Sequence, residues 1–352
     1  MDQEHGLRTY GYGVCFGRLR LSWERVVIDL SSPESSTQNA DIILESIAIE
    51  LRSMVPLEAI LPSEHIREPF EDSSYDMQHC IHVDSFLYDD DDFDDMCSDG
   101  KVPRFFCKDC DSRNTEPLEV ISHSLSRTRL KYIFQAMLPP LEHLTLLDVG
   151  SRLGAVLYGA FLYTNAAKII GVEINSDFCK LQTETIRKHS MQQTVELLPT
   201  ALPVDIVTAK VWCTATDNVI VGTTVVPRWS QSGASVTLHS LRVLCGQDRV
   251  QVVNTDIVCQ PELVSSADVV VLNNVFQFFL ELDKQADMWR FLRSSVKPGT
   301  ILVTIPALHQ VLVLDQAGID LSQWVEEIPL HNVHAVTMDK EDLEDVKHYR
   351  VK

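Results

Sequence analysis

Carboxylates and glycines follow two short apolar runs near the middle of the sequence. In LLDVGSRLG, Asp148 lies two residues before Gly150, and in GVEIN the second apolar run ends at Glu173. A glycine turn between a strand and a helix lets backbone N–H groups approach a ligand closely, because glycine has no Cβ in the way. A carboxylate at the end of the next strand can accept hydrogen bonds from two adjacent ribose hydroxyls. The spacing therefore predicts a site for a cofactor that contains a nucleoside.

Polar residues also end two later apolar runs. VQVVNTDI places Asp256 before Ile257, a pair that could bind the amino group of an adenine and cover its ring. ADVVVLNNV contains Asn273 and Asn274 at its end, where open α/β sheets bind their ligands. An NAD site is disfavoured, because the turn lacks the further glycines of the G-x-G-x-x-G pattern.

Strands and helices alternate along this part of the chain, which is typical of a parallel sheet with crossover helices. The uninterrupted Val and Ile runs suit strands that are buried on both faces. We therefore expect an α/β fold with a doubly wound, Rossmann-like sheet. The expected strands are 144–150, 168–174, 250–257, 267–275 and 299–307, and the expected helices are 155–166, 177–189 and 288–296.

The N-terminal third has a different pattern. Ile43, Ile47 and Leu51 fall at helical spacing and predict a helix over 40–54, and a second helix is expected over 118–138. The expected regions are an N-terminal helical or irregular segment (1–70), an acidic cysteine-rich region (71–117) and the sheet domain (118–352).

Residues 194–246 fit this pattern poorly. A short connection would suffice between the flanking helix and strand, yet about fifty residues intervene. The segment is either an insertion, which we favour, or it hides a strand that belongs to the sheet.

The stretch from about Thr145 to Leu308 resembles the class I S-adenosylmethionine (SAM)-dependent methyltransferases, a seven-stranded doubly wound family whose first motif is a strand and a glycine turn. Within that family, DVGSRLG, GVEIN, TDI and VLNNVFQF are similar to segments of the non-SET histone lysine methyltransferases. The likeness covers under half of the chain, and it is specific for SAM and only suggestive for a histone. At Arg152 this sequence departs from the family, which usually has a second glycine there.

The resemblance implies a role for each motif residue. The methionine end of SAM would lie along the glycine turn, the ribose at Glu173, the adenine at Asp256, and the transferred methyl group near Asn273. The implied cofactor-binding residues are Asp148, Gly150, Ser151, Gly154, Glu173, Ile174, Asp256, Ile257 and Asn273, and the implied catalytic residues are Asn273 and Asn274.

The acceptor expected from these patterns is a protein, with a lysine amine as one candidate. Phe276 and Phe278 could wall its pocket, although such aromatic residues more often belong to the core. The D/N-P-P-Y/F motif of enzymes that methylate exocyclic base amines is absent, because Val275 and Phe276 follow Asn274. Two alternatives stay open: a catalytically impaired pseudo-methyltransferase or zinc-bearing scaffold, and an enzyme that methylates small molecules.

Four residues of the acidic region could bind zinc. Cys107 and Cys110 form a C-x-x-C pair, a spacing that lets two thiolates bind one tetrahedral ion. With Cys80 and His82 they would complete a structural zinc site in a small N-terminal region, and His79 or Cys97 could substitute. Ordinary free thiols are the alternative, and a redox dithiol is a minor third one.

The formal net charge of −20 bears on partners and location. Such a chain repels phosphate backbones on average, so a basic protein partner is favoured over nucleic acid. No membrane span and no secretion signal are expected from the sequence, which favours a cytoplasmic or nuclear location. The acidic run 84–99 is expected to be a solvated loop, with attraction of a basic tail as the alternative.

Overall fold

The computed structural model describes residues 33–66, 79–109, 113–191, 221–223, 241–243, 248–330 and 345–352. The chain divides into two compact units. The larger unit comprises residues 30–192 and 248–352, and the smaller one comprises 1–29 and 193–247. Within the smaller unit, the described residues are those of the antiparallel strands β7 (Val221–Thr223) and β8 (Leu241–Val243). The rest of the expected insertion 194–246 lies outside the described residues.

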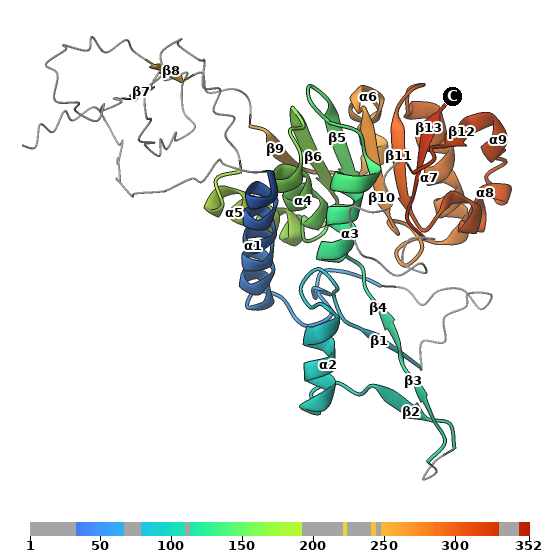
Figure 1. Ribbon diagram of the computed structural model, residues 1–352. Helices are drawn as coiled ribbons and strands as arrows, with labels where there is room; N and C mark the ends of the chain where they lie inside the picture. The colour runs from blue at the N-terminus through green and yellow to red at the C-terminus, as the bar shows by residue number, and fades with distance from the viewer. Residues whose placement is uncertain are drawn as a thin grey trace, which may run out of the picture. The chain divides into compact units, whose positions relative to one another are not determined.

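A seven-stranded sheet forms the centre of the larger unit (Figure 1). Its order is β12-β13-β11-β10-β5-β6-β9, and β13 alone runs antiparallel to its neighbours. The five strands expected from the sequence are confirmed as β5, β6, β9, β10 and β11, whereas β12 and β13 were not predicted. The bounds are β5 Thr145–Val149, β6 Lys168–Glu173, β9 Val250–Asn254, β10 Val269–Asn273, β11 Ile301–Ile305, β12 Val325–Glu327 and β13 Lys347–Val351.

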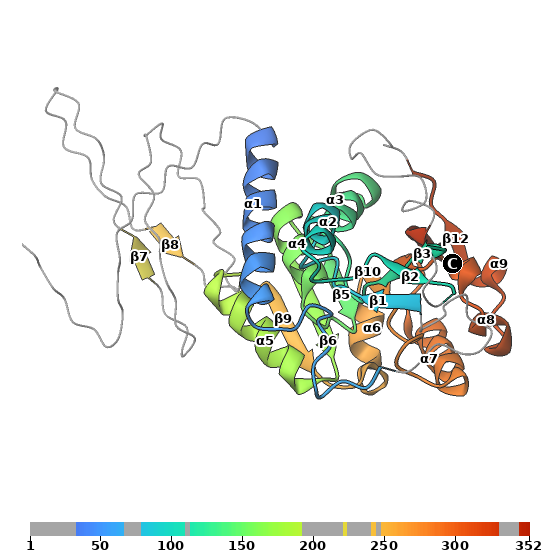
Figure 2. The ribbon, with the colours of Figure 1, turned by 90° about the horizontal axis from the view of Figure 1, so that it is seen from below.

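Helices cover both faces of the sheet, so the doubly wound α/β prediction is confirmed. Side chains alternate along each strand, and Leu146 and Leu147 of β5 therefore enter different hydrophobic clusters. One cluster includes residues of α1, α3, α4 and α5, and the other includes residues of α6, α7, α8 and α9. Figure 2 shows α4 and α7 on opposite sides of the strands. The bounds are α3 Arg127–Tyr132, α4 Ala155–Tyr163, α5 Ser176–Lys188, α6 Pro261–Ser266, α7 Leu282–Ser295, α8 Val313–Gln316 and α9 Leu321–Trp324.

The first expected helix is present as α1 (Pro33–Arg52). Its stripe of fully buried side chains includes Leu44, Ile47 and Leu51, which pack in the cluster that α4 also joins. Ile43, which the helical spacing placed in the stripe, is 40% exposed instead. The expected face is thus confirmed at Ile47 and Leu51, and Leu44 takes the buried place expected of Ile43.

The expected helix over 118–138 is wrong at its start. Residues Glu119–Ile121 form strand β4, which pairs in parallel with β1 (Cys80–His82). The helix begins only at Arg127, after Ser126, whose hydroxyl accepts a hydrogen bond from the Arg129 N–H at 3.2 Å. It continues as a π-helical turn over Ile133–Met137. The Ser side chains before Arg127 favour turns and caps over helix interior, which the apolar pattern did not reveal.

The acidic run forms a helix, α2 (Asp90–Ser98), where a loop was expected. Asp89 caps its N-terminus together with Asp92 in a capping box, and further Asp residues fill the first turn, where the helix dipole favours negative charge. Arg52 pairs with Asp92, and Arg127 pairs with Asp89. Part of the negative charge of this run is thus neutralised within the fold.

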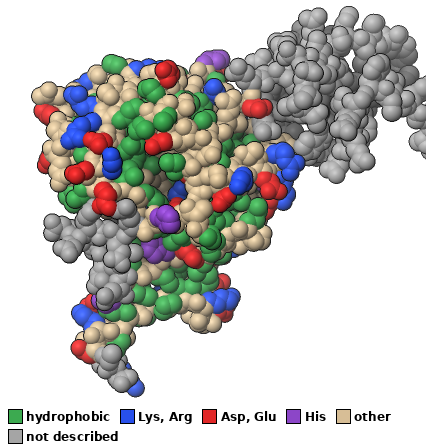
Figure 3. Space-filling view, turned by 180° about the vertical axis from the view of Figure 1, so that it is seen from behind, with side chains coloured by type: hydrophobic (Ala, Val, Ile, Leu, Met, Phe, Trp, Pro, Cys, Tyr) green, Lys and Arg blue, Asp and Glu red, His purple; other side chains and the backbone are tan. Residues whose placement is uncertain are grey.

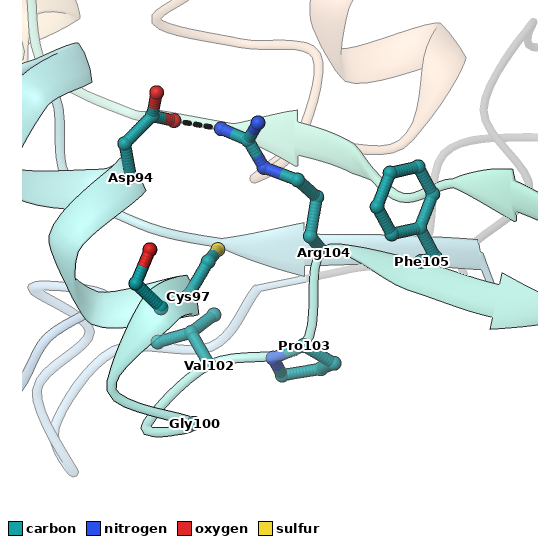
Figure 4. Close-up of a pocket in the computed structure, with 8 residues that line it drawn as sticks. Asp94, Cys97, Gly100, Val102, Pro103, Arg104 and Phe105 are labelled. Carbon is teal, nitrogen blue, oxygen red and sulfur yellow. Dashed lines mark ion pairs between the residues drawn. The ribbon is translucent and has the colours of Figure 1, made fainter.

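A hollow of about 570 Å³ lies between α2, the loop that follows it and the start of β2 (Phe105–Cys107), which pairs with β3 (Thr115–Pro117). Figure 4 shows the ion pair of Asp94 and Arg104 on one side of the hollow, and Val102 and Pro103 in the loop on another. None of the expected SAM-binding residues lines this hollow. Among the described residues, no helix has both the length and the apolar character needed to cross a bilayer.

Candidate functional site

The turn after β5 has the backbone that its glycines predict. Gly150 and Gly154 both have positive φ angles, of 74° and 87°. A Cβ at Gly150 would lie 2.4 Å from Cγ2 of Val275, so only glycine lets the segment after β10 approach the turn this closely. The turn therefore lies directly between the ends of β5 and β10.

Glu173, at the end of β6, holds this turn in place. One of its carboxylate oxygens accepts a hydrogen bond from the backbone N–H of Arg152 at 2.8 Å, and the other accepts one from Asn175 at 2.7 Å. Burial raises the pKa of Glu173, and the two backbone hydrogen bonds oppose this shift. Each oxygen keeps a second lone pair, so a carboxylate in this position can still accept from a ribose hydroxyl.

Asp148 is buried inside the end of β5, with 2% of its surface exposed. Burial raises the pKa of its carboxyl to about 8, and the nearby Glu173 adds to the shift. A carboxyl that resists ionisation in the empty fold is costly to stability at neutral pH, and residues of this kind concentrate at functional sites.

Replacing Asp148 with asparagine should stabilise the cofactor-free protein at high pH. The pKa of this carboxyl is about 8 in the fold against a reference of 3.8, so the wild type loses stability as pH rises from about 4 to 8. Asparagine removes this pH dependence, and at pH 8 the free energy of unfolding should rise by about 2 to 4 kcal/mol. Guanidinium denaturation at pH 5 and pH 8 measures the effect. Equal pH dependence in the two proteins would show that Asp148 ionises freely in the fold.

Ser151 and the backbone of the turn are held by α5. The Ser151 hydroxyl donates to Gln182 Oε1 at 2.9 Å, and Gln182 Nε2 donates to the Arg152 carbonyl at 2.7 Å. Gln182 is fully buried, and no sequence motif indicated its role. In this structure the side chain of Ser151 shapes the turn, and its role toward a cofactor remains a prediction.

Arg152 occupies the position where a second glycine was expected, with φ of 39°. Its Nε and Nη2 donate to the two oxygens of Glu64 at 2.9 and 2.8 Å, and Nη2 also donates to the Ala59 carbonyl at 2.9 Å. The guanidinium carbon lies 5.1 Å from the ring centre of Phe178 and 5.9 Å from that of Phe279. The segment after α1 thus packs against the glycine turn through a buried ion pair.

The expected adenine end is shaped by several residues around the ends of β6 and β9. The Asp256 side chain caps a short turn by accepting from the Val258 N–H at 3.1 Å, and Ile257 is buried in the core. Ile174 is 69% exposed and presents an apolar side chain to solvent after the end of β6. Asn254, which the sequence did not single out, donates to the carbonyls of Glu173 and Ile174 at 2.9 and 3.0 Å.

The end of β10 contacts the N-terminal region. Asn273 Nδ2 donates to the carbonyl of His123 at 3.2 Å, and Asn274 has a positive φ of 46°. The His123 ring packs edge-on against Phe278 at 5.1 Å between centres and lies 5.7 Å from Phe279. Aromatic rings and an imidazole therefore surround the point where the methyl acceptor was expected.

His123 forms a pair with His82, and sequence reasoning missed this pair. Nε2 of His123 lies 3.1 Å from Nδ1 of His82, and Nδ1 of His123 is buried with no hydrogen-bond partner in the described structure. Burial first, then the charge of Arg152 and then His82, lower the pKa of His123 to about 3. His123 is consequently neutral at physiological pH.

No protein-family model and no curated protein sequence matches this chain. Among solved structures, it is similar to PKMT2 from Rickettsia typhi at 16% identity and a TM-score of 0.29, over 51% of this chain and 25% of that one. It is also similar to a SAM-dependent O-methyltransferase from Thermotoga maritima (13% identity, TM-score 0.35, 66% of this chain and 67% of that one). An rRNA methylase from Streptococcus thermophilus gives 7% identity and a TM-score of 0.32, over 65% of this chain and 98% of that one. The chain spans about a quarter of the length of PKMT2, and these likenesses do not define an acceptor.

The sheet order and the turn after β5 carry the assignment of the fold. Seven strands with helices on both faces, and an acid followed by a glycine turn at the end of a central strand, are what the family resemblance implied. The chain has a doubly wound, Rossmann-like α/β fold, as this resemblance implied. Within this fold, the polar residues expected to bind SAM end adjacent strands: Asp148 on β5, Glu173 on β6 and Asn273 on β10, with Asp256 just beyond β9.

The zinc prediction is not confirmed. The described residues contain no group of three or more His, Cys, Asp or Glu side chains placed to bind a metal ion. His82 contacts His123, and the Cys107 thiol donates to the Asp109 carbonyl at 2.6 Å. Cys80 lies 3.9 Å from a Glu119 oxygen, and Cys110 lies outside the described residues. The described members of the expected ligand set thus contact other groups, and the described residues show no zinc site.

Proposed function

We propose that this chain is a SAM-dependent methyltransferase that acts on a protein, with a lysine amine as the favoured acceptor. The observation that carries the proposal is the row of polar residues at the carboxyl ends of four adjacent parallel strands, β9, β6, β5 and β10. In open α/β sheets this edge is where ligands bind. The turn beside that row has glycines with positive φ at Gly150 and Gly154, as a turn that follows a cofactor closely requires.

Each residue of the row has a role in the proposal. Glu173 would accept hydrogen bonds from the ribose, Asp256 would bind the adenine amino group, and the turn at Gly150 would receive the amino-acid end. Bound SAM would supply a methyl group on a sulfonium, which is already a good leaving group. The protein then has mainly to align the acceptor and exclude water.

The surroundings of Asn273 suit a neutral nitrogen acceptor. Its Nδ2 donates a hydrogen bond to the His123 carbonyl, and the Oδ1 of the amide is an acceptor. An amine must arrive without its proton to attack, and Asn273 Oδ1 could orient it by accepting an N–H. His123 is buried against Phe278 and Phe279, and because burial lowers its pKa to about 3 it adds an uncharged imidazole to the same wall.

Charge supports a protein acceptor over a nucleic acid. The net charge is −20, and nucleic-acid binding usually rests on many Lys and Arg contacts to phosphates. On the face shown in Figure 3, blue Lys and Arg side chains are interspersed with red Asp and Glu side chains. A basic segment of a substrate protein fits such a surface better than a phosphate backbone does.

A second candidate function, a scaffold with this fold and no catalysis, is favoured by one observation. Arg152 stands in the glycine turn and is tied to Glu64, where the family usually has an open glycine. If this ion pair fills the space of the amino-acid end, SAM cannot bind. The two candidates therefore differ in cofactor affinity.

Calorimetric titration of the full chain with SAM and with S-adenosylhomocysteine (AdoHcy) separates them. The enzyme should bind both with micromolar Kd, and the scaffold should bind neither. Incubation of a cell extract with tritiated SAM, with and without the protein, then identifies the acceptor. Label in protein bands supports the proposal, and label only in RNA or small molecules contradicts the protein acceptor.

A further inference from the structure

Arg152 is the most unusual polar residue of the site. Only 7% of its surface is exposed, and one of its terminal nitrogens, Nη1, is buried with no hydrogen-bond partner in the described structure. A buried guanidinium nitrogen with two unused N–H donors is costly, because it has lost its water and gained nothing in exchange. Such a group needs either an explanation within the fold or a ligand.

The rest of the guanidinium is fully engaged. The Glu64 carboxylate accepts hydrogen bonds from Nε and Nη2, and the Ala59 carbonyl accepts a second hydrogen bond from Nη2. The rings of Phe178 and Phe279 lie within 6 Å, at 5.1 and 5.9 Å. Because the guanidinium is planar, Nη1 lies on the side away from the Glu64 contact. That side is the part of the group still able to bind something.

The neighbouring acidic groups do not supply the missing partner. Both oxygens of Glu173 accept backbone N–H groups, one of them from Arg152 itself. Asp148 lies in the strand below the turn, and burial raises its pKa to about 8, which disfavours its anionic form. Arg152 and Glu64 therefore neutralise each other, and what the site still offers a ligand is the pair of unused N–H donors on Nη1.

We propose that Nη1 of Arg152 binds the α-carboxylate of the amino-acid end of SAM. This inference rests on the proposed function. A bulky residue at a glycine position would be expected to obstruct the cofactor. In this proposal the Arg152 side chain binds the cofactor instead. Glu64 and Ala59 hold the guanidinium in place beforehand, so little side-chain entropy is lost when a carboxylate arrives. The turn backbone that binds the cofactor would thus carry its own carboxylate receptor.

The test compares two ligands that differ in the amino-acid end. AdoHcy carries the α-carboxylate, and 5′-methylthioadenosine has the same nucleoside and sulfur without it. Both are titrated calorimetrically into wild type, Arg152→Met and the control Arg249→Met. Arg249 is half-buried, and its nitrogens donate to the carbonyls of Ala166, Phe161 and Thr164 at the amino ends of the strands, away from the proposed site.

We expect Arg152→Met to weaken AdoHcy binding about 30-fold, the loss of one charge-assisted hydrogen-bonded contact, and methylthioadenosine binding less than 3-fold. Arg249→Met should change neither ligand's Kd by more than about 3-fold. Equal weakening of both ligands by Arg152→Met would mean that Arg152 only supports the fold, and no weakening of either would mean that it does not reach the ligand. Either result overturns the inference while leaving the proposed function in place.

A second variant guards against loss of folding. Arg152→Gln combined with Glu64→Gln removes both charges, so no unpaired charge is left buried. This double variant should show the same selective loss of AdoHcy affinity, and non-selective loss contradicts the inference. If wild type binds neither ligand, the proposed function fails, and the inference fails with it.

Discussion

Replacing Glu64 with alanine should lower the free energy of unfolding by about 3 to 5 kcal/mol, because it strands a buried cation. The side chains of Glu64 and Arg152 are each only 9% exposed, and Glu64 accepts two hydrogen bonds from the guanidinium. Removing one partner of a buried pair leaves the other desolvated and uncompensated. Guanidinium or urea denaturation followed by circular dichroism measures the change.

Glu116→Ala is the matched control for this variant. Glu116 pairs with Lys108, and the two side chains are 51% and 43% exposed. Its loss should cost less than about 1 kcal/mol, as is usual for surface ion pairs. If Glu64→Ala destabilises the protein no more than Glu116→Ala, the segment after α1 does not dock on the glycine turn as the structure has it.

Glu173→Gln should weaken AdoHcy binding at least about 100-fold, which is the second large effect. A carboxylate offers acceptors on both oxygens, whereas the glutamine amide turns one of them into a donor. That NH₂ group would face the backbone N–H of Arg152 or Asn175, which the carboxylate now binds. The variant therefore loses both a ribose acceptor and one tether of the turn.

Two readouts separate these losses. Loss of the hydrogen bond between Glu173 and a backbone N–H of the turn should lower the free energy of unfolding without ligand by about 1 to 3 kcal/mol. Loss of the ribose contact should lower the affinity for AdoHcy. Glu262→Gln, at the exposed start of α6, is the control and should change neither. Destabilisation without any change in Kd would reduce Glu173 to a structural residue and remove it from the proposed cofactor site.

The central sheet was predictable because its signal is local. Buried parallel strands read as unbroken runs of Val, Ile and Leu, so β5, β6, β9, β10 and β11 were evident from the sequence. Strands β12 and β13 were missed. Lys347–Val351 has charged, polar and apolar residues in a stretch of five residues and no apolar run, and Val325–Glu327 has only three residues.

The contacts around the site were less predictable, because they join residues far apart in the sequence. Glu64 meets Arg152 across 88 residues, and His123 meets Asn273 across 150. A pattern of types and spacing cannot indicate such pairs. His82 illustrates the consequence: its place near cysteines suggested a zinc ligand, yet the fold brings it to His123.

The role of Arg152 could not be predicted from its position in the sequence alone. The departure from the family pattern was visible there, but the effect of the residue depends on where its side chain lies. The fold buries it against Glu64, Phe178 and Phe279, and leaves one nitrogen available. Whether a bulky residue obstructs or binds could be argued only from that geometry.

A crystal structure of the full chain with AdoHcy bound would locate the cofactor site. We expect the adenine and ribose between Ile174 and Asp256, with the ribose hydroxyls on Glu173 and the amino-acid end along the turn at Gly150. Ligand density at another edge of the sheet, or a turn that still holds the Arg152–Glu64 pair with AdoHcy excluded at saturating concentration, would contradict it.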